Sequence, residues 1–152
     1  MDPLDVMGSR VRPEGSKFST SFPSLFPMTE PIIIALDCMG GDLGVRATIP
    51  GAERALAHNP NLHFLLFGRT REIESELGHY PGLRAVSTLH HADVVIAAHE
   101  KPSIALRQGR DSSMRKAIEA VSNNTAHCIV SSGNTGALMA TAKIVLKTMP
   151  GI

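Results

Sequence analysis

The feature that most constrains the fold is an uninterrupted aliphatic run at residues 32–36, which ends at Asp37 and is followed by a pair of glycines. Continuous β-branched and aliphatic residues are typical of a strand whose two faces are both buried. Parallel sheets contain such strands because helices cover both of their faces. The run therefore predicts the first strand of an α/β protein.

Segments of strand and helix character alternate along the rest of the chain. Short apolar runs predict further strands at 63–68, 83–89 and 127–131, and apolar spacing with turn residues predicts helices at 45–58, 70–77, 102–108, 111–124 and 134–147. Pro50 fits its helix only in the first turn or at a bend, and Asp111 or Ser112 is expected to cap the fourth helix. Because strands that alternate with helices pair in parallel, we predict a layered α/β/α sandwich with a mainly parallel sheet.

Residues 1–30 have a different composition. They contain four prolines among serine, glycine and mixed charges, and they show neither helical nor strand periodicity. We predict a disordered N-terminal extension here, followed by one folded unit over residues 31–152. Met28 is a candidate for the physiological start. A transit peptide is the alternative, against which the acidic residues of the segment argue.

Composition narrows the class of protein. A formal net charge of +1 gives no broad attraction to nucleic acid or anionic lipid, so an anion site has to be local. No segment has the about 20 apolar residues that a membrane span needs, and no secretory signal is evident. Cys38 and Cys128 lack CxxC or metal-ligand spacing, so we expect both to be reduced, buried residues of a cytoplasmic protein. The histidines show no ligand spacing either, and no metal site is predicted.

The loop that follows the first predicted strand carries two glycines between two acids. Asp37 and Asp42 would repel a nucleotide phosphate, so the loop is unlike a dinucleotide fingerprint. In one interpretation Gly40 and Gly41 let the main chain approach a ligand closely, with the acids orienting donors or a cation. In the other, which the residues alone favour, the loop is a tight turn whose carboxylates cap the next helix.

A second loop, at the end of the last predicted strand, contains only small polar residues and glycines. They are Ser131, Ser132, Gly133, Asn134, Thr135 and Gly136. The loop opens a helix, whose first backbone N–H groups lack intrahelical partners and lie at the positive end of the helix dipole. A helix cap needs a single polar side chain, whereas this loop supplies four polar side chains that can donate hydrogen bonds. We therefore predict an anion site here rather than a cap alone.

A third segment, residues 105–117, places arginines around a serine pair at a helix start. We expect Arg107 and Arg110, with Ser112 and Ser113, to contribute to the same anion site in preference to Arg115, which fits a site residue and a solvated charge equally well. The chain has neither a GxSxG motif nor an evident Cys/His nucleophile pair. Catalysis would therefore depend on positioning and electrostatics.

The motifs LDCMGGD, KPSIALRQGRDSSM and SSGNTGALMA, in this order, resemble those of the acyl-carrier-protein-dependent phosphate acyltransferases of bacterial phospholipid synthesis. The resemblance extends from Ile32 to the last residue. It implies an enzyme of lipid metabolism in which inorganic phosphate displaces acyl carrier protein from a long-chain acyl thioester and acyl phosphate is released. It also implies a homodimer in the full-length form, a fold like that of isocitrate and isopropylmalate dehydrogenases, and no metal or organic cofactor.

The resemblance assigns roles to the candidate residues. Asn134, Asp37 and Asp42 are assigned to the catalytic centre, where the two acids hold the turn in shape rather than attack the substrate. The substrate-binding set is Gly40, Gly41, Arg107, Arg110, Ser112, Ser113, Ser131, Ser132, Gly133, Thr135 and Gly136. Phosphate is expected at the SSGNTG loop. The thioester oxygen is expected at backbone N–H groups near Gly40 and Gly41, or at Asn134.

The chain departs from the family pattern in three ways. Ser132 replaces an alanine, Cys38 replaces an apolar residue, and the chain corresponds to an N-terminal half with the C-terminal half absent. A non-catalytic fragment that dimerises or binds a partner through an exposed sheet edge therefore stays an alternative, as does a decarboxylating-dehydrogenase relative. The reading frame beyond Ile152 discriminates the enzyme from the fragment. Peripheral membrane contact is expected only of the full-length form.

Overall fold

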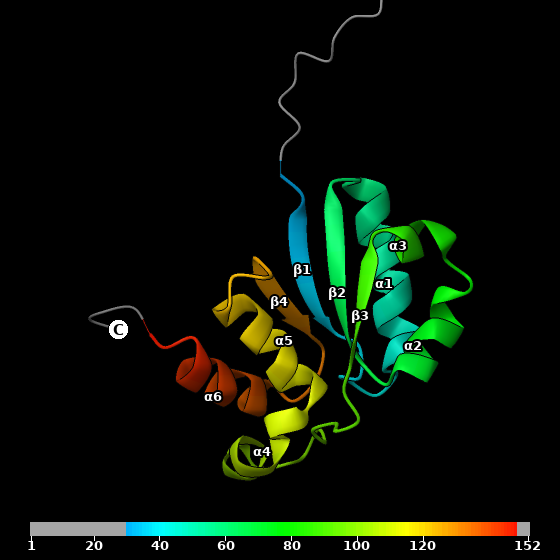
Figure 1. Ribbon diagram of the computed structural model, residues 1–152. Coiled ribbons are helices and arrows are strands. Elements are labelled where there is room, and N and C mark those ends of the chain that lie inside the picture. The colour runs from blue at the N-terminus through cyan, green and yellow to red at the C-terminus, as the bar shows by residue number, and fades with distance from the viewer. Residues whose placement is uncertain (1–29, 149–152) are drawn as a thin grey trace, which may run out of the picture.

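A computed structural model describes residues 30–148 (Figure 1). The elements follow the order β1 (Ile32–Asp37), α1 (Val45–His58), β2 (Leu62–Gly68), α2 (Thr70–Leu77), α3 (Pro81–Ala85), β3 (Ser87–His91), α4 (Pro102–Gln108), η1 (Gly109–Asp111), α5 (Ser113–Ser122), β4 (Cys128–Ser131) and α6 (Thr135–Val145). Residues 1–29 of the predicted extension, including Met28, lie outside the described residues, and only its last residue, Glu30, is described. No helix within residues 30–148 is long and apolar enough to span a membrane.

The four strands form one sheet in the order β3-β2-β1-β4, and every neighbouring pair is parallel. The prediction of an α/β protein with a parallel sheet is therefore confirmed. β1 lies between β2 and β4, and Asp37 at its end pairs in register with both Phe67 and Ser131. The carboxyl ends of these three strands, and the loops that follow β1 and β4, are thus brought together at one end of the sheet, which we call its carboxyl edge.

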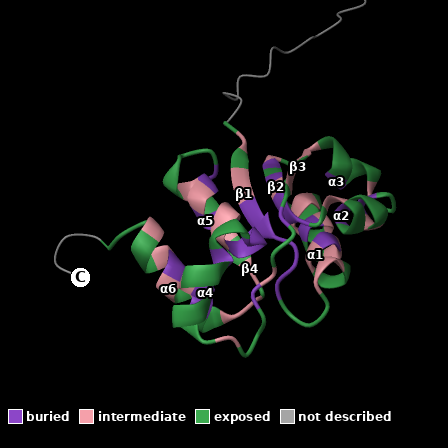
Figure 2. Ribbon diagram, turned by 60° about the horizontal axis from the view of Figure 1, so that its bottom comes forward, coloured by how far each residue is buried: buried purple, intermediate pink, exposed green. Residues whose placement is uncertain are grey.

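Helices cover both faces of the sheet (Figure 1). On one face Leu36 packs in a core with Ile49 of α1 and Ile73 of α2. On the other face Ala35 packs with Ala117 of α5, and α4 and α6 join α5 in a third cluster. Successive residues of β1 therefore enter different cores, which explains why the run is apolar without interruption. Figure 2 shows the buried residues of the strands between the two helical layers.

Three predicted helices, 45–58, 70–77 and 102–108, are confirmed at both ends. The helix predicted at 134–147 is shorter, since α6 covers Thr135–Val145. Pro50 lies inside α1 at the sixth position, past the first turn, where its ring removes one backbone donor. Ser112 is the cap of α5, and its hydroxyl oxygen accepts from the backbone N–H of Arg115.

The strand predicted at 83–89 is wrong in its first half. Residues 81–85 form the short helix α3, and the strand begins only at Ser87. Pro81 stands at the start of α3, where a fixed φ suits a helix and a missing N–H costs nothing. Leu83 is fully buried in the core with α1 and α2, so its apolar character serves helix packing rather than a strand.

The prediction for the cysteines is confirmed for Cys38, which is buried, and wrong for Cys128, which is exposed. The reason is the position of β4 at the edge of the sheet. Ile129 faces the core formed with α5, whereas Cys128 and Val130 alternate onto the α1 side of the sheet, where Val130 is 50% exposed. α1 does not extend over this strand.

Candidate functional site

The loops after β1 and β4 contact each other through glycines. A Cβ atom on Gly40 would lie 2.7 Å from the backbone nitrogen of Gly133. Gly41 has a φ of +76°, which a side chain disfavours, and a Cβ atom there would lie 3.0 Å from the carbonyl oxygen of Ser132. The glycine pair and the SSGNTG loop therefore pack directly against each other, with no room for a side chain between them.

A depression of about 500 Å³ lies where the two loops meet. It is lined by Gly40, Gly41, Asp42, Leu43, Ala47, Ala98, Ser132, Gly133, Asn134 and Thr135. The volume is within the range of small-molecule sites, and the carboxyl edge of a parallel sheet is where α/β proteins bind ligands. The structure thus brings together candidate residues from two motifs that are about 90 residues apart in the sequence.

Asp37, the last residue of β1, links the two loops through hydrogen bonds of its carboxylate. Its side chain is 2% exposed, and one carboxylate oxygen accepts from the Ser131 hydroxyl at 2.7 Å, while the other accepts from the backbone N–H of Met39 at 3.2 Å. None of the ion pairs within residues 30–148 involves Asp37. The carboxylate is therefore held by hydrogen bonds alone. Asp42, in contrast, is exposed at the rim of the depression.

The two serines of the loop donate their hydroxyl hydrogens to protein acceptors. Ser131 donates to Asp37 and also accepts from the backbone N–H of Gly133 at 3.1 Å. Ser132 donates to the carbonyl oxygen of Gly40 at 2.9 Å. A hydroxyl carries a single hydrogen, so in this arrangement neither serine donates to a ligand. Donation to phosphate from these serines stays a prediction that requires another rotamer.

Asn134 is the cap of α6. Its side-chain oxygen accepts from the backbone N–H of Ala137 at 3.0 Å, and its amide nitrogen donates to the carbonyl oxygens of Ala97 at 3.1 Å and Glu100 at 2.8 Å. Both amide hydrogens are thus engaged, and the side chain ties the start of α6 to the segment before α4. A catalytic role for Asn134 stays a prediction, and it requires release of one of these carbonyls.

Donors without a protein acceptor remain at the first turn of α6. Among the described residues, no acceptor takes the backbone N–H groups of Thr135 and Gly136 or the Thr135 hydroxyl. Thr135 is exposed and lines the depression. Gly136 does not line it, so the Thr135 hydroxyl and N–H, together with the positive end of the helix dipole, are the donors that an anion in the depression would meet first.

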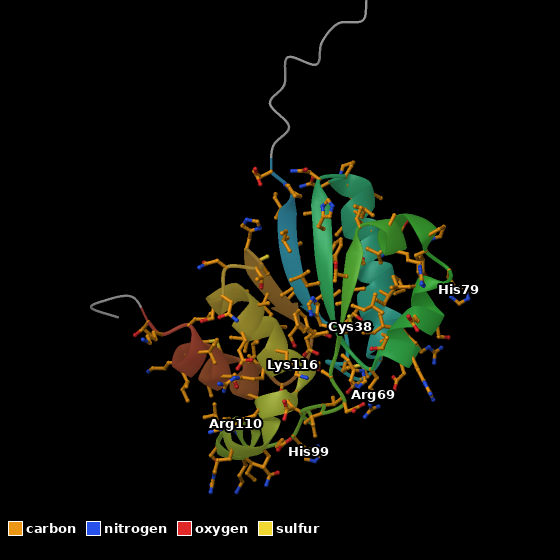
Figure 3. The ribbon with its side chains drawn as sticks, viewed as in Figure 1. Cys38, Arg69, His79, His99, Arg110 and Lys116 are labelled. Atoms are coloured by element: carbon orange, nitrogen blue, oxygen red, sulfur yellow. The ribbon has the colours of Figure 1, made fainter. Side chains whose placement is uncertain are left out.

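The third predicted segment does not line the depression. Ser112 and Ser113 are 0% and 2% exposed, and the Ser112 hydroxyl donates to the carbonyl oxygen of Gly109 at 2.7 Å. Arg107 and Arg110 are exposed, and Figure 3 places Arg110 by α4, apart from Cys38 at the end of β1. Arg115 forms an ion pair with Glu119 on the same helix, with a distance of 2.7 Å between Nε and Oε1.

Other reactive groups near the sheet edge are constrained by their surroundings. Burial, together with the neighbouring Asp37 carboxylate, raises the pKa of the Cys38 thiol to about 12, so the thiol carries its proton at neutral pH. His90 stacks on Phe67 with ring centroids 4.7 Å apart, and burial lowers its pKa. Over residues 30–148, no three or more His, Cys, Asp or Glu side chains gather as a metal site would require.

Sequence reasoning missed three apolar residues that line the depression, Leu43, Ala47 and Ala98. It also missed the carbonyls of Ala97 and Glu100 that hold Asn134. An apolar side chain or a backbone carbonyl carries no motif signal. These contributions depend on where the segment before α4 passes in the folded chain.

Comparison with known proteins defines the class to which the chain belongs. Residues 32–152 match the model of a family described as fatty acid synthesis protein, and the chain is a member of that family. Together with the relatives named phosphate acyltransferase that follow, this match confirms the resemblance indicated by the three motifs.

Individual relatives share a more particular name. The chain is 52% identical over 126 residues to a phosphate acyltransferase of Rhodopseudomonas palustris, a match that covers 82% of this chain and 36% of the relative. It is 52% identical over 125 residues to a phosphate acyltransferase of Rhodospirillum centenum, with 82% and 35% covered. A phosphate acyltransferase of Nitrobacter hamburgensis is 51% identical over 126 residues, with 82% and 36% covered. The chain spans about a third of the length of these curated relatives.

Proposed function

We propose that this chain is part of a phosphate acyltransferase that converts long-chain acyl-[acyl-carrier-protein] and inorganic phosphate to acyl phosphate and free carrier protein, for phospholipid synthesis. One observation carries the proposal. Two glycine-rich loops, both within residues 32–152 that match the fatty acid synthesis family, together line the depression at the carboxyl edge of the sheet. An acyl transfer to phosphate needs an anion site and a carbonyl site at such close range.

Phosphate binds at the first turn of α6 in this proposal. The Thr135 hydroxyl and N–H, which line the depression, and the Gly136 N–H of the same turn donate to its oxygens, since no acceptor within residues 30–148 takes these three hydrogens. The thioester carbonyl lies toward Gly40 and Gly41, whose backbone N–H groups stabilise the negative charge that develops on its oxygen. Asp37 and Ser131 keep the two loops at the distance that the reaction needs.

The reaction then needs no covalent enzyme intermediate. A phosphate oxygen attacks the carbonyl carbon, a carbon–oxygen bond forms, and the carbon–sulfur bond to the carrier breaks. The hydrogen phosphate loses its proton and the departing carrier thiolate gains one, so atoms and charge balance. The protein contributes orientation and hydrogen-bond donors.

The proposal extends to a protein of the length of the relatives, about a third of which this chain covers. We propose a homodimer in the cytoplasm, with acyl carrier protein as partner and peripheral membrane contact, and a complete fold like that of isocitrate and isopropylmalate dehydrogenases. The parallel sheet with helices on both faces is consistent with such a fold. A non-catalytic fragment is the alternative that the following experiment excludes or reveals.

The test is an assay of the protein expressed from its complete reading frame. Acyl-carrier-protein thioesters of several chain lengths are incubated with phosphate, and acyl phosphate is trapped with hydroxylamine as the hydroxamate. We expect Thr135→Val to raise the KM for phosphate about tenfold or more, because it removes a hydrogen bond to a charged group while it keeps the shape of the side chain.

Thr88→Val on β3 is the matched control, since Thr88 is also exposed and does not line the depression. Absence of hydroxamate at every chain length would defeat the proposed function. An unchanged KM for phosphate in Thr135→Val would remove Thr135 from the phosphate site.

A further inference from the structure

A second depression adjoins the first on the α1 face of the sheet. It has a volume of about 360 Å³, and we call it the α1 groove. Its strand side is formed by Ile34, Phe64 and Val130, and its helix side by short residues of α1 that include Gly51 and Ala55. The lining is almost entirely apolar. The groove is open because α1 does not extend over β4 and leaves Val130 50% exposed.

The α1 groove is continuous with the polar depression. Ala47 and Ser132 line both. Ser132 follows β4 and donates its hydroxyl hydrogen to the carbonyl oxygen of Gly40, so the junction lies at the contact between the two glycine-rich loops. A molecule with a polar end in the depression therefore has an apolar channel directly beside it.

We propose that the α1 groove holds the fatty acyl chain of the donor, an inference that rests on the proposed function. The reacting carbonyl lies between the loops, and the hydrocarbon passes Ala47 and Ser132 to lie against Ile34, Phe64 and Val130. Apolar surface removed from water supplies the affinity, about fourfold for each methylene at about 0.8 kcal/mol.

The size of the groove agrees with a fatty acyl chain. If a methylene needs about the 30 Å³ that a water molecule occupies in the liquid, 360 Å³ accommodates roughly a dozen methylenes. A protein segment that packed on Val130 would not need an opening at Ser132 into the polar depression, whereas an acyl chain whose carbonyl lies in the depression does. The continuity of the two hollows favours the acyl chain over another segment of the protein or a second copy.

Gly51→Leu is the decisive variant. Gly51 lines the groove and a Cβ atom on it meets no atom within 4 Å, so a leucine side chain starts from open space there and adds apolar bulk to the lining; leucine is also a better helix former than glycine. Gly82→Leu in α3 is the matched control. Gly82 is also an exposed helical glycine at which a Cβ atom would meet no atom within 4 Å, and it does not line the groove.

Two measurements separate this inference from the proposed function. The first is kcat/KM for acyl phosphate formation with hexanoyl, dodecanoyl and hexadecanoyl carrier protein, using the protein from the complete reading frame. We expect Gly51→Leu to lower the dodecanoyl and hexadecanoyl values at least tenfold, to leave the hexanoyl value within about twofold, and to leave the KM for phosphate unchanged. Gly82→Leu should match the wild type throughout.

The second measurement is direct binding of cis-parinaric acid, a fluorescent fatty acid, which needs no turnover. Weaker binding in Gly51→Leu but not in Gly82→Leu supports the groove even if the wild type makes no acyl phosphate. A chain-length profile unchanged by Gly51→Leu overturns the inference and leaves the proposed function intact, and failure of the wild type to bind the probe also overturns it. A lower melting temperature or loss of a dimer in Gly51→Leu overturns it as well, because the groove would then be covered by protein.

Discussion

Replacing Ser131 with alanine removes the hydroxyl that donates to the buried carboxylate of Asp37 at 2.7 Å. Asp37 is 2% exposed, has no ion-pair partner within residues 30–148, and keeps only the longer bond of 3.2 Å from the Met39 N–H. A buried charged group that loses a hydrogen bond cannot regain it from water. The variant therefore tests whether Ser131 serves primarily to hold the two loops together.

The expected loss of stability follows from the character of the bond. Hydrogen bonds to charged groups contribute about 1.5–3 kcal/mol, and the Gly133 N–H also loses its acceptor in the Ser131→Ala variant. We expect a decrease of about 3 kcal/mol in the free energy of unfolding. Ser132→Ala is the control, because Ser132 is exposed and donates to a neutral carbonyl, and it should cost about 1 kcal/mol.

Urea unfolding followed by circular dichroism measures the difference. With an m value of about 2 kcal/mol/M, the midpoint should fall by about 1.5 M in Ser131→Ala and by about 0.5 M in Ser132→Ala. A second comparison uses Asp37→Asn, which removes the charge and keeps an acceptor oxygen. In that background Ser131→Ala should cost about 2 kcal/mol, roughly 1 kcal/mol less than with Asp37, because the bond to position 37 is then between neutral groups while the Gly133 N–H still loses its acceptor.

Equal midpoints for Ser131→Ala and Ser132→Ala would refute the reasoning. So would a Ser131→Ala cost that is the same with Asp37 and with Asn at this position, since the charge of Asp37 would then not be the cause. An unchanged midpoint with a raised KM for phosphate would show instead that Ser131 is primarily a phosphate ligand.

Three further predictions concern the same end of the sheet. Gly40→Ala should separate the loops, because the new Cβ atom would lie 2.7 Å from the Gly133 nitrogen. We expect the free energy of unfolding, measured in urea, to fall by about 1–3 kcal/mol, and acyl phosphate formation to be lost. Wild-type values for both measurements would contradict the contact between the loops. The Cys38 thiol should be unreactive, so an aromatic disulfide reagent at pH 8 should titrate one thiol of the native 152-residue chain, the exposed Cys128, and two after unfolding. Because burial raises the folded-state pKa of Cys38 from 9.0 to about 12, the folded state keeps a proton that the unfolded state loses. The difference in free energy of unfolding between wild type and Cys38→Ala should therefore be constant below about pH 9. From pH 9 toward pH 12 the wild type should lose stability relative to Cys38→Ala, and a constant difference across that interval would contradict the raised pKa.

Most elements were predictable because local sequence encodes them. The aliphatic run of β1 and the apolar spacing of α1 and α2 needed no knowledge of neighbours, and the predicted bounds of both helices are those of the structure. The strand predicted at 83–89 failed because a short apolar segment has no unambiguous period. Packing of Leu83 against α1 and α2, after a proline that starts a turn, made its first half helical.

The exposure of Cys128 was not predictable for a different reason. Its strand has the apolar character of a buried element, and its neighbour Ile129 is packed against α5. Whether the other face is covered depends on what lies beside β4, the last strand of the sheet order. A single strand sequence does not contain that information.

The sequence by itself determined the α/β class, the family and the two glycine-rich loops, because composition, periodicity and motifs are properties of contiguous residues. The tertiary structure decided which donors of those loops stay available. It places β1 beside β4, so Ser131 and Ser132 meet acceptors 94 and 92 residues away, and it passes residues 97–100 by Asn134. Hydrogen bonds form within about 3 Å, and only the strand order and the path of the chain set such distances between remote segments.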